Sequence, residues 1–295
     1  MPDRADAELV RRGLARSRRH ASALVVEGRV RADGVLVAKA SAQVPVTAEL
    51  VVAPDPDDPG YASRAGGKLA GALDALDADA AGRAVTRRIE GARCLDLGAS
   101  TGGFTDVLLR RGAARVTALD VGHDQLVDRL RHDDRVAVVE GFNVRDLTPS
   151  DLEGPPDVVV GDLSFISLRL VVGAVAGVTA PGATVLLLVK PQFEVGRERL
   201  GRGGVVRDPA LRAGSVVDVT LQAAAAGFGA RAVVPSPVPG PSGNHEYFCW
   251  FERAAGAVEV DTEEVARAAE AAVEWRTDGT PPVITVAPRR QEGTS

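Results

Sequence analysis

The stretch LDLGASTGGFTDVLLRRG, from Leu95 to Gly112, decides how the rest of the chain is interpreted. It joins a short apolar run to an apolar-periodic run through a glycine-rich turn, which is typical of a strand followed by a helix. The turn matches two motifs at once. Gly98, Ser100 and Gly102 fit the nucleophile elbow of a serine hydrolase, and they also fit the floor of a nucleotide pocket. The sequence around this turn must decide between the two.

Strands and helices alternate from Ser63 onward. The candidate strands are apolar runs at 92–96, 116–120, 136–140, 157–161, 183–189 and 247–251, with helical patterns between most of them. This order predicts an α/β fold with a doubly wound, largely parallel sheet. Ligands bind such sheets at the carboxyl ends of the strands. Asp96, Asp120, Asp162 and Lys190 all stand at or just past predicted strand ends, on that side of the sheet.

The N-terminal part has a different pattern. Helical runs at 5–13 and 17–27 precede Asp33-Gly34, a hairpin signal between alternating valines, and a further strand at 48–52. Prolines and aspartates dominate APDPDDPG, which indicates a linker. We predict a small α+β domain over 1–52, a linker over 53–62, the α/β domain over 63–253, and a C-terminal helix with a mobile tail over 254–295.

Composition excludes several classes of protein. The chain is 45% hydrophobic and 25% charged, which is ordinary for a globular protein. Cys94 and Cys249 are the only cysteines and stand in apolar runs, so we expect buried thiols and no disulfide framework. The first residues contain no apolar signal-peptide core, which favours a cytoplasmic location. The uncharged run 170–189 is long enough to span a bilayer, but Pro181-Gly182 divides it, and we predict a helix, a turn and a buried strand.

The glycine-rich turn and Asp120 point to an adenosine-type cofactor. Gly98, Gly102 and Gly103 allow a ligand to approach the backbone near a helix N-terminus. Asp120 ends the next strand, twenty-two residues after Gly98, where an acid can hold ribose hydroxyls. The run G-A-S-T-G-G lacks the phosphate-binding pattern G-x-G-x-x-G, which favours S-adenosylmethionine over NAD. The alternative, a tight turn with no ligand, leaves Asp120 unexplained.

A hydrolase would need an acid and a histidine downstream of Ser100, and Asp162 and His245 stand in a permissible order. The elbow strand, however, is the first clear strand of its domain, and no HGGG-type oxyanion segment precedes it. We therefore expect Ser100 to line a pocket.

Lysine is rare in this chain: only Lys39, Lys68 and Lys190 occur among 35 basic residues. A lysine amine can lose its proton in a suitable environment, whereas arginine stays charged, so a retained lysine is a candidate for acid–base work. The alternative is a leftover surface residue. Lys190 ends a buried apolar strand, where a charged side chain needs a partner or a function. Asp162 and Glu246 could converge on the same mouth of the sheet.

The net charge of the chain is −5, yet residues 9–40 contain eight basic residues and only two acidic ones. This local excess indicates either an RNA-binding surface or a solvated basic face.

These motifs resemble the TlyA family of bacterial ribosomal RNA 2′-O-methyltransferases, some of which are also described as haemolysins. The likeness spans about 7–251 and rests on DAELVRRGLARSR, SRAGGKL, LDLGASTGGFTDVLL, DLSFISL, VKPQFEVG, GGVVRDP and PGPSGNHEYF. It implies an FtsJ-type, Rossmann-like methyltransferase domain preceded by an RNA-binding domain named after ribosomal protein S-four. It also implies S-adenosylmethionine as cofactor and ribosomal RNA or ribosomal subunits as partners, with no metal, membrane or obligate protein partner.

The resemblance assigns roles to individual residues. The catalytic tetrad falls on Lys68, Asp162, Lys190 and Glu246. The cofactor motif falls on Gly98, Ser100 and Gly102, with Asp120 on the ribose and Asn143 at the adenosine end. Phe165 and Ser242 match positions near the target nucleotide. The RNA-facing positions are Arg12, Arg16, Arg18 and Lys39. The chain departs from the family at 59–62, where Pro-Gly-Tyr-Ala replaces an Arg-x-Trp-Val-like segment.

The implied reaction is in-line attack of a cytidine 2′-oxygen, in 23S and 16S ribosomal RNA, on the sulfonium methyl. We assign Lys190 to deprotonate or steer the hydroxyl, with Lys68, Asp162 and Glu246 around it. Two alternatives are a membrane-active haemolysin and an RNA-binding module without catalysis. Liposome leakage that is lost when the run 170–189 is broken would favour the first, and the intact tetrad argues against the second.

Overall fold

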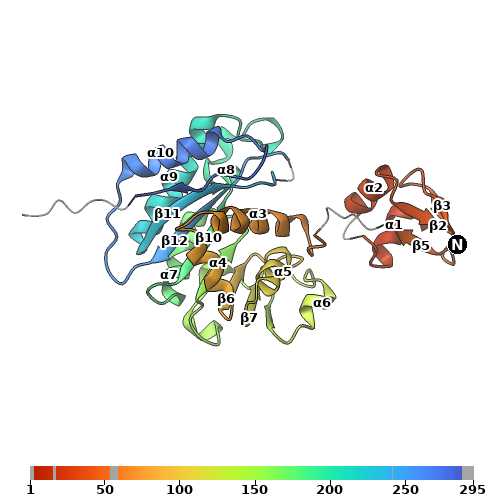
Figure 1. Cartoon of the computed structure of the whole chain (residues 1–295), viewed down its shortest axis with the longest axis horizontal. Helices are drawn as coiled ribbons and strands as arrows, with labels where there is room; N and C mark the ends of the chain where they lie inside the picture. The colour runs from red at the N-terminus through yellow and green to blue at the C-terminus, as the bar shows by residue number, and fades with distance from the viewer. Residues whose placement is uncertain (1–2, 16–17, 54–58, 241, 288–295) are drawn as a thin grey trace, which may run out of the picture. The chain divides into compact units, whose positions relative to one another are not determined.

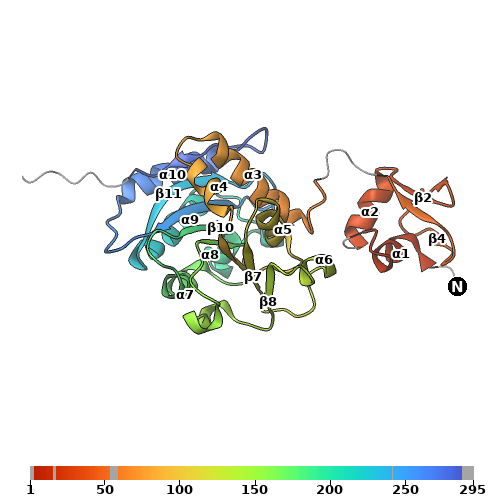
Figure 2. The same ribbon diagram turned by 60° about the horizontal axis from the view of Figure 1, so that its bottom comes forward.

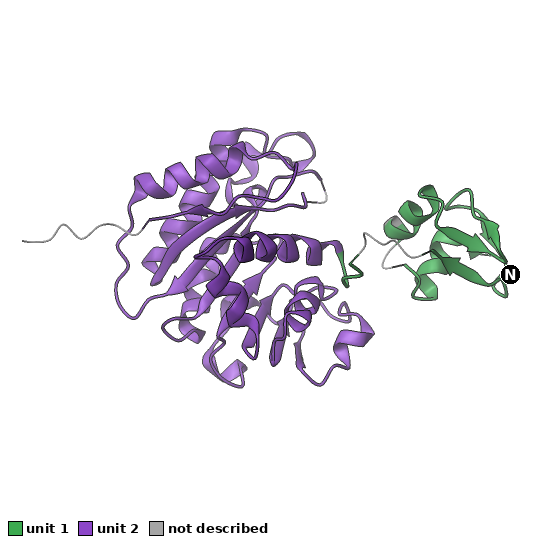
Figure 3. Ribbon diagram, viewed as in Figure 1, with its two compact units in different colours: residues 1–63 green, residues 64–295 purple. Residues whose placement is uncertain are grey.

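The computed structural model describes residues 3–15, 18–53, 59–240 and 242–287, and the chain forms two compact units, 1–63 and 64–295 (Figures 1 and 3). The predicted linker lies partly outside the described residues, because 54–58 are not among them.

Unit 1 is a small α+β domain. Its helices are α1 (Ala5–Arg11) and α2 (Arg18–Val26). Its strands are β1 (Asp3–Arg4), β2 (Val30–Ala32), β3 (Val35–Leu36), β4 (Gln43–Val44) and β5 (Leu50–Val52), in sheets ordered β1-β4 and β3-β2-β5. The predicted hairpin is present, with Asp33 and Gly34 at φ +49° and +79°. Helices and strands share one apolar core that includes Leu9, Leu24 and Val30.

Unit 2 is built on an eight-stranded sheet of order β13-β11-β12-β10-β9-β6-β7-β8. The strands are β6 (Arg93–Leu97), β7 (Arg115–Leu119), β8 (Val136–Val139), β9 (Val158–Gly161), β10 (Thr184–Val189), β11 (Phe228–Pro235), β12 (Tyr247–Arg253) and β13 (Ile284–Thr285). From β10 to β8 the sheet is parallel, whereas β12, β11 and β13 pair antiparallel. The predicted largely parallel α/β sheet is confirmed, and β11 and β13 are additions to the predicted strands.

Helices cover both faces of this sheet (Figures 1 and 2). They are α3 (Arg64–Ala78), α4 (Arg83–Ile89), α5 (Gly103–Arg110), α6 (Asp128–Arg131), α7 (Val172–Val178), α8 (Pro191–Glu194), α9 (Pro209–Ala225) and α10 (Thr262–Glu274). Short 3-10 turns are η1 (Val144–Asp146), η2 (Pro149–Asp151), η3 (Leu168–Leu170), η4 (Arg197–Arg199) and η5 (Arg202–Gly204). Helices α9 and α10 lie side by side against β11.

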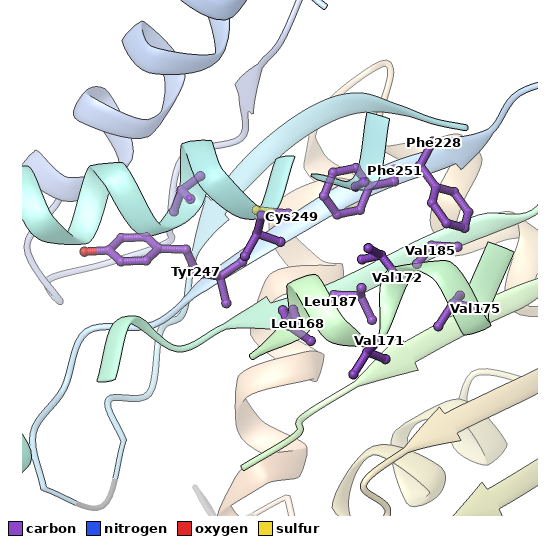
Figure 4. Packing of buried hydrophobic residues seen from close by; sticks show 14 of the residues in the cluster. Leu168, Val171, Val172, Val175, Val185, Leu187, Phe228, Tyr247, Cys249 and Phe251 are labelled. Atoms are coloured by element: carbon purple, nitrogen blue, oxygen red, sulfur yellow. The ribbon is translucent and has the colours of Figure 1, made fainter. Parts of the chain in front are cut away.

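Strand β12 contributes alternate side chains to the two faces. Tyr247, Cys249 and Phe251 are buried in the cluster that contains α7, α9 and α10 (Figure 4). Phe248 instead meets Phe104 of α5, with ring centroids 5.9 Å apart. Each aromatic ring removes a large apolar area from water, so β12 holds both helical layers to the sheet.

The predicted C-terminal helix is present as α10, whereas the segment after it differs from the predicted mobile tail. Helix α10 belongs to the core of unit 2 through Val265, Ala268 and Ala272. Beyond it, β13 pairs with β11, with Thr285 opposite Ala232. This segment is ordered because Ile284 and Val286 place apolar side chains against the core. The glycines and prolines around these two residues gave no indication of a strand. Residues 288–295 lie outside the described part of the chain.

The uncharged run 170–189 folds as predicted, into α7, a turn and the buried strand β10. Among the described residues, no helix has both the length and the apolar character that crossing a bilayer requires. Cys94 and Cys249 are buried free thiols, as expected.

Candidate active site

The glycine-rich turn between β6 and α5 has a backbone that few side chains could adopt. Gly98, Ser100 and Gly102 have φ values of +80°, +47° and +96°, in the left-handed region. A Cβ atom on Gly102 would lie 2.4 Å from Leu130 Cδ1 and 2.8 Å from Leu126 Cδ1. Glycine is therefore required here for both conformation and space. The turn leads directly into α5, whose first residue is Gly103.

A cavity of about 760 Å³ opens beside this turn, at the carboxyl ends of β6, β7 and β9. Its volume lies in the range of roughly 300–1,000 Å³ that is usual for small-molecule sites. The predicted residues on its wall are Gly98, Ser100, Asp120, Asn143, Asp162 and Phe165. Gln125 and Phe142, which the sequence analysis missed, also line it. Gly102 and Gly103 shape the turn and are not on the wall.

Asp120 is held rigidly at the end of β7. One carboxylate oxygen accepts a hydrogen bond from the backbone N–H of Ser100 (2.8 Å), and the other accepts one from Gly122 (2.7 Å). The carboxylate thus stands on the cavity wall in a fixed orientation, which suits a bidentate contact with ribose hydroxyls. Asn143 caps η1 by accepting from the Arg145 N–H (3.1 Å).

The surroundings of the Ser100 hydroxyl distinguish a hydrolase nucleophile from a pocket residue. Its hydroxyl donates to Gln125 Oε1 at 3.1 Å, and no hydrogen bond joins it to a histidine in the part of the chain that the structure describes. Burial, with the nearby charge of Arg212, lowers the pKa of His245. Ser100 is a pocket residue, and the hydrolase alternative finds no support.

Four charged side chains form a continuous chain next to the cavity. Lys68 Nζ lies 2.6 Å from Glu246 Oε2 and 3.7 Å from Asp162 Oδ2. Lys190 Nζ lies 2.6 Å from Asp162 Oδ1, an ion pair without the alignment of a hydrogen bond. Lys68, Lys190 and Glu246 are buried. Burying charges is costly unless they are paired, and here two positive groups meet two negative ones.

Neighbouring polar groups complete this network. Lys190 Nζ donates to Ser164 Oγ (2.8 Å), and Gln192 Nε2 donates to Glu246 Oε1 (3.1 Å). Ser164 and Asp162 both line the cavity, so Lys190 lies directly behind its wall. The residues missed by the sequence analysis, Ser164 and Gln192, lie within or next to the motifs DLSFISL and VKPQFEVG.

Phe165, which lines the cavity, forms an aromatic pair with Phe193 of α8. The side chain of Phe165 is 92% exposed, and its φ of +64° is strained for a bulky residue. Its ring lies 5.2 Å from that of Phe193, which is also 5.9 Å from Lys190 Nζ. An exposed aromatic ring on a strained backbone beside a pocket is unfavourable in water and suits stacking against a flat ligand. Ser242 is also exposed, in the turn before Glu246.

The RNA-facing candidates of unit 1 have diverse surroundings. The Arg12 guanidinium is occupied within the fold, by Glu8 (2.6 Å) and by the carbonyl oxygens of Ala48 (2.5 Å) and Val46 (2.7 Å). Hydrogen bonds from Arg11 and then Arg12 lower the pKa of the buried Glu8 to about 2. The Arg12 guanidinium therefore stabilises the fold of unit 1, and its contact with RNA stays a prediction.

Arg18 and Lys39 remain available. The Arg18 side chain is 61% exposed, at 3.4 Å from Asp6, and Lys39 is exposed. Arg16 lies outside the described residues.

Comparisons with known proteins identify the family to which the chain belongs. Residues 61–253 match the FtsJ-like methyltransferase family, and residues 3–50 match the S4 domain. The chain is 52% identical to the 16S/23S rRNA (cytidine-2′-O)-methyltransferase TlyA of Mycobacterium tuberculosis, over 84% of this chain and 89% of that protein. It is 37% identical to Hemolysin A of Brachyspira hyodysenteriae, over 81% of this chain and 95% of that one. A solved "putative hemolysin" from Streptococcus thermophilus superimposes with a TM-score of 0.69 at 35% identity, covering 91% and 94%.

The fold, the cavity and these matches define an FtsJ-like methyltransferase, a class that uses S-adenosylmethionine. The chain belongs to the TlyA family within it. The residues present fit this cofactor, because a rigid acid and a close glycine backbone face a cavity of suitable volume.

Replacement of Asp120 by alanine is expected to weaken S-adenosylmethionine binding ten- to a hundredfold, because the ribose would lose its charged hydrogen-bond acceptor. Isothermal titration calorimetry measures this affinity. Asp146→Ala, an exposed aspartate near the same cavity, is the matched control and should bind normally. Unchanged affinity in Asp120→Ala would remove the ribose role.

A second prediction concerns Asp96, which lies fully buried in β6 beneath the turn. Burial raises its pKa to about 7, against an opposing hydrogen bond from Thr105 Oγ1 (2.7 Å). Because this value exceeds the unfolded 3.8, the native state binds the proton more tightly. Protonation of Asp96 therefore adds to the free energy of unfolding. This contribution is fully present below pH 4 and is lost as the pH rises through 7.

The permanently neutral Asp96→Asn should consequently gain stability relative to the wild type between pH 4 and pH 8, by on the order of 1–4 kcal/mol. Urea unfolding followed by tryptophan fluorescence measures this, since both tryptophans, Trp250 and Trp275, belong to unit 2. A stability difference that does not change with pH would contradict the prediction.

Proposed function

We propose that this chain transfers a methyl group from S-adenosylmethionine to the 2′-oxygen of cytidine in ribosomal RNA, both 23S and 16S, in the cytoplasm. The observation that carries the proposal is the buried chain Glu246–Lys68–Asp162–Lys190, which ends at the wall of a cofactor-sized cavity. The similarity to a 16S/23S rRNA (cytidine-2′-O)-methyltransferase supports the choice of RNA and nucleotide.

When bound, S-adenosylmethionine supplies an electrophilic methyl group on a sulfonium. The protein must then align a ribose hydroxyl with that methyl, and fixed geometry of this kind lowers a barrier substantially. Lys190 is assigned to orient the 2′-hydroxyl, because its amine lies just behind Asp162 and Ser164 on the cavity wall. It is also assigned to accept the hydroxyl proton, and this second role requires the amine in its neutral form, because an ammonium group has no lone pair. Lys68 and Glu246 hold Asp162 in place.

Access to a ribose requires its nucleotide to leave the stacked helix, because a stacked base keeps the sugar away from a recessed site. Phe165, exposed on the cavity wall, is assigned to stack against the displaced base, and Ser242, exposed on the turn before Glu246, is assigned to contact the target nucleotide. Unit 1 is assigned to RNA binding through Arg18, Lys39 and, outside the described residues, Arg16.

A segment of unit 2 also has the character of an RNA contact. Residues 196–207 carry four exposed arginines and a single acid, Glu198; the arginines are Arg197, Arg199, Arg202 and Arg207. Within the described residues these four side chains have no ion pair or hydrogen bond. The segment is attached beside the tetrad, because Asn244 accepts from the Val206 N–H (2.9 Å) and donates to the Gly204 carbonyl (3.0 Å). Unpaired guanidinium groups suit phosphate oxygens.

The decisive test is methyl transfer from labelled S-adenosylmethionine to unmodified 16S and 23S RNA, as free RNA and as subunits. We expect 2′-O-methylcytidine with the wild type and at least a thousandfold slower transfer with Lys190→Ala. Lys190→Arg should also be inactive, since arginine cannot accept the proton, while Lys39→Arg should keep methyl-transfer chemistry. An absence of label in every RNA would overturn the function, and an active Lys190→Arg would overturn the proton transfer.

Substituting all four arginines of 196–207 by glutamine should weaken RNA binding and reduce the slope of log K against log salt by roughly 0.9 for each phosphate that is no longer neutralised. Filter binding at several salt concentrations measures both. The matched control replaces Arg83, Arg87 and Arg88, exposed arginines on α4, and should change little. If both variants weakened RNA binding equally, the effect would come from the total charge of the protein and not from this segment.

A further inference from the structure

One cavity wall is formed by the segment 162–170, which leads from β9 into η3. Asp162, Ser164, Phe165, Ser167 and Leu170 all belong to this wall. The segment is irregular and includes the strained backbone of Phe165. A strained conformation of this kind persists only where the surrounding contacts determine it. The contacts that hold the wall in place are therefore of mechanistic interest.

The beginning of the wall is held by Lys190, through Asp162 and Ser164. Its other end is held by Glu194, four residues further along the chain. The Glu194 carboxylate accepts hydrogen bonds from Ser167 Oγ (2.5 Å) and from the Leu168 backbone N–H (2.7 Å). Both carboxylate oxygens are thus used on the wall.

Glu194 is a buried acid, which is unusual for its residue type. Its only cationic neighbour among the described residues is Arg169, 3.5 Å from Oε2, which also donates to the Glu194 carbonyl (3.3 Å). Burial raises the pKa of Glu194. Burying a carboxylate costs free energy unless hydrogen bonds offset that cost. The two hydrogen bonds that Glu194 accepts from the wall therefore contribute to holding both partners in place.

Lys190 directly precedes the short helix α8, whose first residue is Pro191 and whose last residue is Glu194. Phe193, within α8, packs against the ring of Phe165. Three residues at or within α8 therefore contact the wall. Lys190 contacts the beginning of the wall, Phe193 contacts Phe165, and Glu194 contacts the far end of the wall. Displacement of the Glu194 carboxylate would free the wall to move relative to Lys190.

We propose that Glu194 is a positioning residue for methyl transfer, which holds the wall 162–170 so that Phe165 and Ser164 keep their places relative to Lys190. This rests on the proposed function for its substrate. Glu194 touches neither the reacting atoms nor the cofactor cavity, and it acts through Ser167 and Leu168. Its removal should lower kcat rather than abolish substrate binding.

The test compares Glu194→Ala, Glu194→Gln and the control Glu270→Ala, an exposed glutamate on α10 that belongs to no site described above. We expect kcat to fall at least tenfold in Glu194→Ala, with the S-adenosylmethionine Kd changed less than threefold. Glutamine can still accept from Leu168 and donate to Ser167, so Glu194→Gln should keep at least a third of the wild-type kcat. Unchanged kcat in Glu194→Ala would overturn the proposal, as would equal decreases of thermal stability and activity in both Glu194 variants.

A readout independent of RNA separates this proposal from the proposed function. Phe165→Trp, in a chain in which Trp250 and Trp275 are replaced by phenylalanine, places a single reporter on the wall. Its steady-state anisotropy should be lower when Glu194 is alanine than when it is glutamate. If no RNA is methylated by any form, the function fails and the anisotropy still tests Glu194. Equal anisotropy in the two backgrounds would overturn the positioning role.

Discussion

The site depends on one carboxylate shared by two amines. Asp162 faces Lys190 with one oxygen and Lys68 with the other, and Glu246 completes the charge balance on Lys68. These groups come from α3, from the ends of β9 and β10, and from the turn before β12. Each would be costly to bury alone, because removing one partner leaves an uncompensated charge. The ion pairs therefore hold four distant parts of the chain at one edge of the sheet, where the cavity lies.

Much of the larger unit was predictable because its central strands are buried on both faces, and such strands form continuous apolar runs. DVVVG and ATVLLLV are runs of this kind, and they became β9 and β10. Strand β11 was missed because glycine and arginine interrupt the first half of FGARAVVP, where residues 229–231 are not buried. Strand β13 has two residues and becomes a strand only through its pairing with β11.

The site residues, like the strands, were predictable only where a sequence pattern marks them. Lys68 and Lys190 were identifiable because lysine is rare here, and the glycine-rich turn and Asp120 follow a known spacing. Residue type alone could not reveal which charges are already neutralised within the fold. Arg12 belongs to a basic run, yet its guanidinium is occupied by Glu8 and backbone carbonyls. Glu194 carries no sequence pattern at all, since its partners Ser167 and Leu168 become neighbours only in three dimensions.

The reversed direction of β12 has a topological consequence. In a wholly parallel sheet, each strand brings to the carboxyl edge the residue that follows it and never the residue that precedes it. Strand β12 runs against β10, with Tyr247 opposite Val189, so the residue that precedes β12 meets the residue that follows β10. Glu246 thereby reaches the edge where Lys190 and Asp162 stand. Had β12 run parallel, Glu246 would lie at the opposite end of the sheet, one strand length away, and Lys68 would lack its second counter-ion.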